Sequence, residues 1–190
     1  MTKRKIIEID RESCNGCGGC VADGAARTSL REQLIAAMFE QFGDDKKRID
    51  HALAVFSYAD QIRNIEGGNT PVVTAAALLH DIGIQEGERI YGSNAPRYQE
   101  LLGPPIARRI MEDLSMDEAT VQHVTRIVGS HHSAGDIDTI EFRIIWDADA
   151  LVNLTDEGPP RSTDQWEKTI EKVFRTGAGK NLARRLFIRR

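Results

Sequence analysis

Two adjacent side chains with the chemistry of metal ligands, His80 and Asp81, end an apolar stretch of the chain. The stretch reads Ala75-Ala-Ala-Leu-Leu-His-Asp-Ile-Gly83. A neutral imidazole nitrogen and an ionised carboxylate oxygen both suit divalent cations. A buried apolar helix has no other evident use for these two groups side by side. The pair therefore predicts a metal site, provided that further ligands converge on it.

The elements that must bring such ligands together are predicted to be helices. Apolar residues recur at helical spacing over most of the chain after residue 28, whereas strand patterns are weak there. We expect helices over 28–42, 49–65, 72–80, 117–128, 141–154, 162–175 and 180–188. Thr70 and Pro71 are expected to cap and begin the third of these. A further helix is expected from Gly103, after a polar loop or short helix over 85–102. The sequence therefore predicts an all-α bundle.

Candidate partners for His80 and Asp81 lie on two of the expected helices. His51 falls in the first turn of the expected helix 49–65, and an acidic pair lies in Asp147-Ala-Asp149-Ala-Leu151. Helical bundles build metal sites from inward-facing side chains of different helices. Asp147 and Asp149 are two residues apart on one helix and so point to nearly opposite faces. We therefore expect only one of them to reach the site.

All three cysteines of the chain, Cys14, Cys17 and Cys20, lie in one short segment. Its spacing resembles the opening of a bacterial ferredoxin motif, in which Gly24 would take the position of the fourth cysteine. Because one thiolate is missing, we expect residues 1–27 to be an incomplete ferredoxin-like leader. An iron–sulfur cluster or zinc remains the lesser alternative, with a fourth ligand such as Asp23 completing the site.

The composition narrows the classes of partner. A net charge of −4 over 190 residues gives no reason to expect nucleic acid or a membrane surface as a general partner. The chain has no apolar run of membrane-spanning length and no apolar leader, so we expect a cytoplasmic protein. Basic residues near the C-terminus are interpreted as a solvated helix end.

Taken together, the ligand candidates resemble the H…HD…D pattern of the HD superfamily of metal-dependent phosphohydrolases. The matching segments are His51, Leu79-His80-Asp81-Ile82-Gly83 and Ala148-Asp149-Ala150-Leu151. The resemblance covers residues 28–190 and implies an all-α HD-domain helical bundle with a small N-terminal appendage. It also implies a divalent metal (Mn, Fe, Mg, Co, Ni or Zn) on His51, His80, Asp81 and Asp149. Asp149 is chosen over Asp147 because Ala-Asp-x-Leu is similar to the last family motif, and Asp147 is expected to support the site or face solvent.

The resemblance also suggests roles around the metal. Some HD subfamilies bind a second metal through histidines placed like His131 and His132, so these two are expected as metal ligands or phosphate donors. A further histidine expected near Gly103 is missing, which argues against a complete second site. Asp81 is expected to orient a water or accept its proton, and Glu86 is a candidate general acid or base. Candidate phosphate-binding residues are Arg48, Arg89, Arg97 and Arg143.

The function implied is hydrolysis of a small phosphomonoester or nucleotide by a metal-activated water. Two alternatives remain: an HD-type diiron oxygenase, and a sensor that binds a nucleotide without turnover. The expected partner is a small phosphorylated molecule, and a homodimer is left open.

Overall fold

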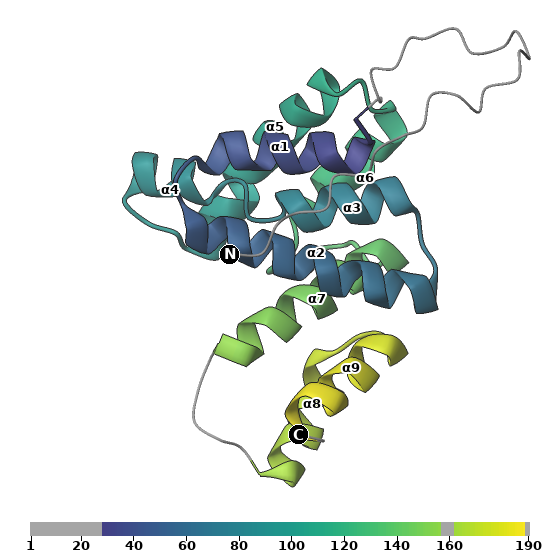
Figure 1. The fold of residues 1–190 in the computed structure, drawn as a ribbon. Coiled ribbons are helices and arrows are strands. Elements are labelled where there is room, and N and C mark those ends of the chain that lie inside the picture. Colours follow the sequence, from purple (N-terminus) through teal and green to yellow (C-terminus); the bar gives the residue numbers. More distant parts are fainter. Residues whose placement is uncertain (1–27, 157–161, 189–190) are drawn as a thin grey trace, which may run out of the picture.

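The fold of the described residues is entirely helical, which confirms the predicted all-α class. The computed structural model describes residues 28–156 and 162–188 (Figure 1). The helices in these ranges are α1 Leu30–Phe42, α2 Lys46–Glu66, α3 Thr70–Leu79, α4 Ile84–Tyr91, α5 Pro96–Asp113, α6 Glu118–Val128, α7 Ile140–Asp156, α8 Thr163–Val173 and α9 Gly177–Phe187. The predicted leader and its cysteines at positions 14, 17 and 20 lie outside the described residues.

Helix α3 is the centre of the bundle, because it is buried on all sides. Every residue from Val72 to Leu79 is buried, and α3 packs against α1, α2, α5, α6 and α7. The helix is capped by the Asn69 side chain, which accepts a hydrogen bond from the Val72 amide, so the predicted cap at Thr70 was wrong by one residue. The Asn69 amide also donates to Glu141 Oε1 at 2.9 Å, which ties the start of α3 to α7.

Helix α2 lies alongside both α3 and α7 and carries the first predicted ligand toward them (Figure 1). It begins at Lys46 because the side chain of Asp45 accepts a hydrogen bond from the Arg48 amide as an N-cap. The predicted start at Ile49 was therefore three residues late, and His51 lies in the second turn rather than the first.

The region predicted to be a polar loop or a short helix, 85–102, is largely helical. It contains α4 and the first part of α5, so only the expectation of a short helix there was correct. No new helix begins at Gly103, because α5 starts at Pro96 and continues through Pro104 and Pro105. Proline removes helical hydrogen bonds, but α5 packs against both α4 and α6, and this packing outweighs the local preference.

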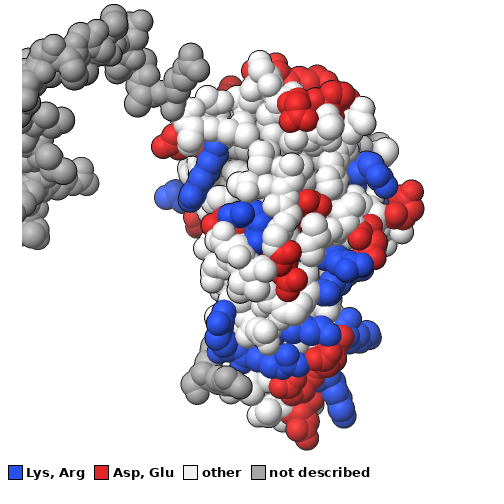
Figure 2. Space-filling model, turned by 90° about the vertical axis from the view of Figure 1, so that its right-hand side faces the viewer, with Lys and Arg blue, Asp and Glu red and all other residues white. Residues whose placement is uncertain are grey.

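Helices α8 and α9 pair with each other below α7, and α9 also contacts α2 and α7 (Figure 1). Basic side chains of α9 pair with acids of α8: Lys180 with Glu171 at 2.6 Å, and Arg184 with Glu167 and Glu171. Figure 2 shows positive and negative side chains intermixed at this end of the molecule. Among the described residues, the helices are too short or too polar to cross a membrane.

Candidate metal centre

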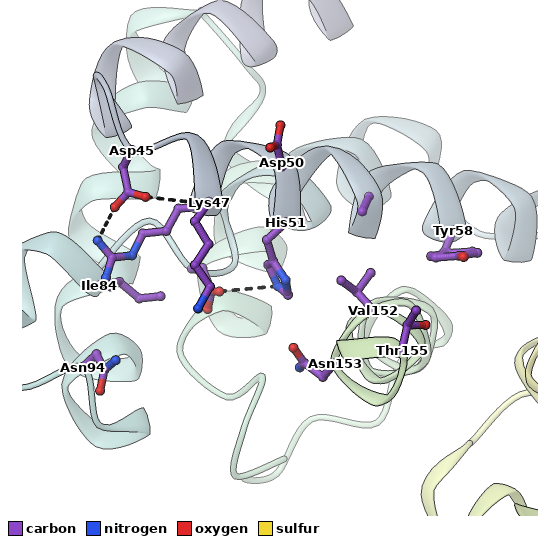
Figure 3. A pocket seen from close by; sticks show the side chains of 13 residues that line it. Asp45, Lys47, Asp50, His51, Tyr58, Ile84, Asn94, Val152, Asn153 and Thr155 are labelled. Carbon is purple, nitrogen blue, oxygen red and sulfur yellow. Dashed lines mark hydrogen bonds and ion pairs between the residues drawn. The ribbon is translucent and has the colours of Figure 1, made fainter. Parts of the chain in front are cut away.

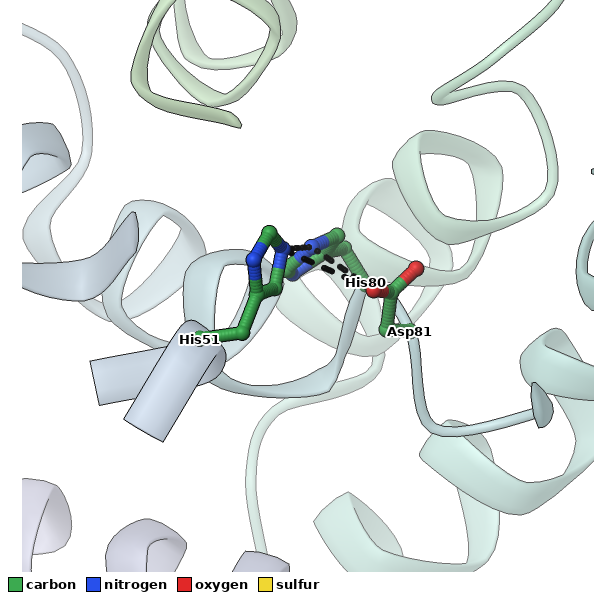
Figure 4. Close-up of side chains that lie close together, drawn as sticks. All are labelled: His51, His80 and Asp81. Atoms are coloured by element: carbon green, nitrogen blue, oxygen red, sulfur yellow. Dashed lines mark hydrogen bonds and ion pairs between the residues drawn. The ribbon is translucent and has the colours of Figure 1, made fainter. Parts of the chain in front are cut away.

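The predicted ligands from three separate elements converge at one point. The Nε2 atom of His51 in α2 lies 3.2 Å from Nε2 of His80, which follows α3. It also lies 3.1 Å from Asp149 Oδ1 in α7 and 3.6 Å from Asp81 Oδ2. His80 Nε2 lies 3.5 Å from Asp81 Oδ2 and 3.7 Å from Asp149 Oδ1. Figure 4 shows the two imidazoles and the Asp81 carboxylate turned toward one another.

Backbone contacts orient His80 for this role. Its Nδ1 lies 2.9 Å from the carbonyl oxygen of Ala77 one turn earlier, and a carbonyl can only accept, so Nδ1 carries a hydrogen. Nε2 is then the atom left to bind either a proton or a metal. The side chain is 1% exposed. Burial favours the neutral imidazole, but the nearby carboxylates of Asp81 and Asp149 outweigh burial and raise the pKa of His80 to about 9.

The two carboxylates are correspondingly held in their charged form. Burial opposes this, but His80 and His131 lower the pKa of Asp81 to about 2. Hydrogen bonds from His51 and His80 likewise hold the pKa of Asp149 well below its usual range, again against the effect of burial. The site therefore concentrates negative charge and imidazole nitrogens around one small volume, which attracts a positive centre.

The donor set fits a divalent ion. Ligands at roughly 2.1 Å from a shared ion lie roughly 3.0 to 3.4 Å apart in octahedral or tetrahedral arrangements. The shortest donor–donor distances here, 3.1 and 3.2 Å, fall in that range, and the longest is 3.7 Å. Two imidazoles with two carboxylates suit the metals between Mg and Zn in hardness. His51, His80 and Asp81 are close enough to ligate one ion together.

Only one of the two candidate acids of α7 reaches this centre. Asp149 contacts His51, and Asn153, one turn further along α7, donates to Asp149 Oδ1 at 3.0 Å. Asp147 is fully buried and points away, where it accepts hydrogen bonds from the amides of Arg175 and Thr176 at 2.7 and 2.8 Å. The Thr176 hydroxyl donates to it as well. Asp147 therefore fastens the α8–α9 connection to α7 rather than facing solvent.

His131 and His132 lie on the other side of Asp81. His131 Nε2 is 3.3 Å from Asp81 Oδ1, while its Nδ1 donates to the Val128 carbonyl at 2.8 Å. With Asp81 these two histidines form a second group that is compact enough for a cation. His132 Nε2 is 2.9 Å from Oε1 of Gln99, a buried residue of α5. Sequence reasoning missed Gln99, which lies one turn before the position where a further histidine was expected.

A pocket of about 600 Å³ opens beside the donor cluster (Figure 3). His51 and Asp81 line it, so the candidate metal centre faces this space. One wall is a face of α2, on which Lys47, His51, Ala54 and Tyr58 recur at helical spacing. The remaining lining residues include Asp45, Arg48, Asp50, Ile84, Asn94, Val152, Asn153 and Thr155.

The other predicted site residues lie elsewhere or are engaged. Glu86 is not among the residues lining the pocket, and its carboxylate accepts a hydrogen bond from Arg89 Nε at 2.7 Å. Arg97 stacks on Tyr98, and Arg143 pairs with Asp138. Of the four predicted arginines, Arg48 alone lines the pocket.

Two pocket residues, Lys47 and Asn153, were not predicted. Each lies four residues from a predicted ligand, Lys47 from His51 and Asn153 from Asp149, which places it on the same helix face as that ligand.

Comparison with known proteins gives three matches. The family model described as HD domain matches residues 48–154. The chain is 27% identical over 133 residues to ribonuclease Y of Treponema denticola, a match that covers 70% of this chain but only 24% of that longer protein. The crystal structure of a predicted HD superfamily hydrolase from an uncultured Thermotogales bacterium has the same fold, with a TM-score of 0.60 at 24% identity, covering 82% of this chain and 83% of that one.

Proposed function

Because the chain belongs to the HD domain family, we propose that it is a metal-dependent phosphohydrolase that cleaves a small phosphomonoester or nucleotide. The observation that carries this proposal is the convergence of His51, His80 and Asp149, with donor atoms 3.1 to 3.7 Å apart. With the adjacent Asp81 they offer two imidazole nitrogens and two carboxylates beside a pocket large enough for a small substrate.

These four residues would hold a divalent ion (Mn, Fe, Mg, Co, Ni or Zn). Such an ion supplies Lewis acidity, which polarises a phosphoryl oxygen and makes a water more acidic. The protein's own contribution is to keep the ligands fixed. His80 is held by the Ala77 carbonyl, and Asp149 is held by the Asn153 amide. Outer contacts of this kind orient ligands and strengthen their binding.

Asp81 is proposed to orient the attacking water by accepting a hydrogen bond from it. Its Oδ2 faces the donor cluster, while its Oδ1 faces His131 at 3.3 Å. A carboxylate with a low pKa stays ionised at neutral pH, so it can accept a hydrogen bond from the water and orient one of its lone pairs toward phosphorus. His131 is the positioning residue that fixes the plane of this carboxylate.

The far part of the pocket is proposed to receive the organic group of the substrate. Ala54, Tyr58 and Val152 give this part apolar and aromatic surface. Tyr58 lies seven residues after His51 on α2, which is about 10 Å along the helix axis. A nucleoside carries its base at a comparable distance from its phosphate, and an aromatic ring is a suitable surface for a planar base.

The test is a metal-by-substrate screen with a matched pair of histidine variants. The full chain is freed of metal, reloaded with Mn, Mg, Co, Ni or Zn, and assayed against p-nitrophenyl phosphate and nucleoside monophosphates. His80→Ala should lose metal and at least about 100-fold of the activity, because a ligand is removed. His123→Ala is the control, since His123 lies in α6 against Thr139, outside the donor cluster. Equal activity of both variants would contradict the proposal.

The same screen separates the two alternatives. Oxygen consumption with two tightly bound irons per chain, and no phosphate release, would favour a diiron oxygenase. Tight nucleotide binding without phosphate release across all metals would favour a sensor.

A further inference from the structure

One pocket cation, Lys47, is placed differently from the arginines of the site. It lies one helical turn before His51 on the same face of α2, about 6 Å along the axis. Figure 3 shows its side chain extending from α2 into the pocket on the side of His51. It is an exposed residue, so its ammonium group keeps its hydration until a ligand arrives.

The neighbouring Arg48 is already neutralised. Its guanidinium pairs with Asp45 through one nitrogen and with Glu88 through another at 2.6 Å. Lys47, in contrast, has no ion pair with any of the residues that the structure describes. A phosphate that enters the pocket can therefore pair with the ammonium group of Lys47, whereas the guanidinium of Arg48 is already paired with two carboxylates.

The charge of the metal centre favours an additional cation near the substrate phosphate. The two negative charges of Asp81 and Asp149 balance a divalent ion. The metal-loaded centre would then have no net positive charge to attract an anionic substrate. A phosphomonoester brings nearly two negative charges at neutral pH. Arg48, Asp45 and Glu88 together keep one net negative charge beside the pocket, and Asp50 also lines it, so both would repel the phosphate. A lysine at the rim, within reach of the non-bridging oxygens, offsets both effects.

We propose that Lys47 is the phosphate-binding residue of this pocket and that Arg48 acts as a structural link between α2 and α4. This inference rests on the proposed function, because it assumes that the pocket beside the donor cluster receives a phosphoryl group. It goes beyond that function by assigning the recognition of the phosphate to one side chain that the family pattern does not include.

The test compares Lys47→Ala with Lys46→Ala, a matched neighbour that does not line the pocket. Inorganic phosphate is the probe, and its binding to the Mn-loaded chain is measured by titration calorimetry with metal content checked in parallel. Lys47→Ala should weaken phosphate binding by roughly 10- to 100-fold, as expected for a lost charge-assisted contact, with metal content unchanged. Lys46→Ala should stay within about twofold. Lys47→Arg should restore most of the affinity, because it keeps the charge.

The outcomes distinguish this inference from the proposed function. If phosphate binding depends on Lys47 but no substrate is turned over, the phosphate site stands and the hydrolase proposal fails. If Lys47→Ala binds phosphate as tightly as the unaltered chain, or if Lys46→Ala weakens binding equally, the assignment of Lys47 is overturned. For an active enzyme, the Lys47→Ala defect should appear in KM more than in kcat, because the ground-state phosphate already uses the contact.

Discussion

The Nε2 atoms of His51 and His80 lie 3.2 Å apart, although the two residues come from different helical segments. The Nδ1 hydrogen of His80 is committed to a backbone carbonyl, so its Nε2 must meet either a proton or a cation at this point. Two carboxylates lie within 3.7 Å of the same atom. The relationship therefore makes protons and divalent metals competitors for one position, and this competition can be measured.

Metal affinity is predicted to rise with pH up to about 9. The pKa of His80 in the metal-free protein is raised to about 9, so below that pH a metal must displace a proton. Displacement of one proton makes the apparent Kd fall about tenfold per pH unit near pH 7, and less steeply as the pH approaches 9. Titration with Mn in buffers of different ionisation enthalpy counts the released protons. An affinity that stays flat across this range would contradict the prediction.

The raised pKa of His80 also predicts how the stability of the metal-free protein depends on pH. A pKa raised on folding contributes stability below the unfolded value, near 6.5, and loses it as the pH rises through about 9. The free energy of unfolding of the metal-free chain should therefore decline between these pH values. In His80→Ala this part of the decline should be absent.

Substitution of the two acids of α7 is predicted to impair different properties, stability for Asp147 and metal binding for Asp149. Asp147→Ala leaves the donors of Arg175 and Thr176 without their acceptor in a buried place, which should cost about 3 kcal/mol of unfolding free energy. Its effect on metal content should be small. Asp149→Ala removes a proposed ligand and should abolish tight metal binding with a smaller loss of stability. Urea unfolding and metal analysis of both variants check this, and the reverse pattern would exchange their roles.

Much of the fold and part of the site were predictable, for different physical reasons. Apolar periodicity predicted the helices α1, α6 and α7 nearly to their ends, because each buries a continuous stripe. A continuous apolar run predicted α3, which is buried on all sides. The continuity of α5 was not predictable, because local proline chemistry opposes it and only packing against α4 and α6 explains it.

Within the site, the sequence pattern predicted the candidate metal ligands, which resemble a family motif. It did not predict the residues that contact those ligands or line the pocket beside them. Asn153 and Lys47 could have been found by counting one turn from Asp149 and His51. Gln99 could not, since its partner His132 lies 33 residues away and only the fold brings the two together.

The amide of Gln99 is predicted to limit the chain to one tightly bound metal. Its Nε2 donates to the Asn94 carbonyl at 2.7 Å, so its Oε1 faces His132 and accepts the His132 Nε2 hydrogen. Gln99→His would offer an imidazole next to Asp81, His131 and His132. The variant should bind up to two Mn per chain, against one for the unaltered protein, as measured by elemental analysis after gel filtration.

The control for this prediction is Gln122→His, which adds a histidine on the exposed side of α6. Electron paramagnetic resonance gives an independent check, because two Mn ions that share Asp81 should couple, whereas a single ion should not. Two coupled ions in the unaltered protein would show that Gln99 does not close the second position.

Gly83 is predicted to be required by close packing rather than by its backbone angles. Its φ of −83° is accessible to any residue, so backbone conformation does not explain why a glycine stands here. A Cβ at this position would lie 2.6 Å from the Gly103 nitrogen and 2.9 Å from the Gln99 carbonyl oxygen, both backbone atoms of α5. Backbone cannot swing aside as a side chain can, so Gly83→Ala should push α5 away from the turn that carries His80 and Asp81. We expect a loss of about 2 kcal/mol in the free energy of unfolding, together with weaker metal binding.

Gly177→Ala is the matched control, because its Cβ would meet Glu66 at an ordinary 3.4 Å. If urea unfolding and Mn titration find Gly83→Ala as stable and as tightly metal-binding as Gly177→Ala, then the contact between α5 and this turn is not what positions the ligands.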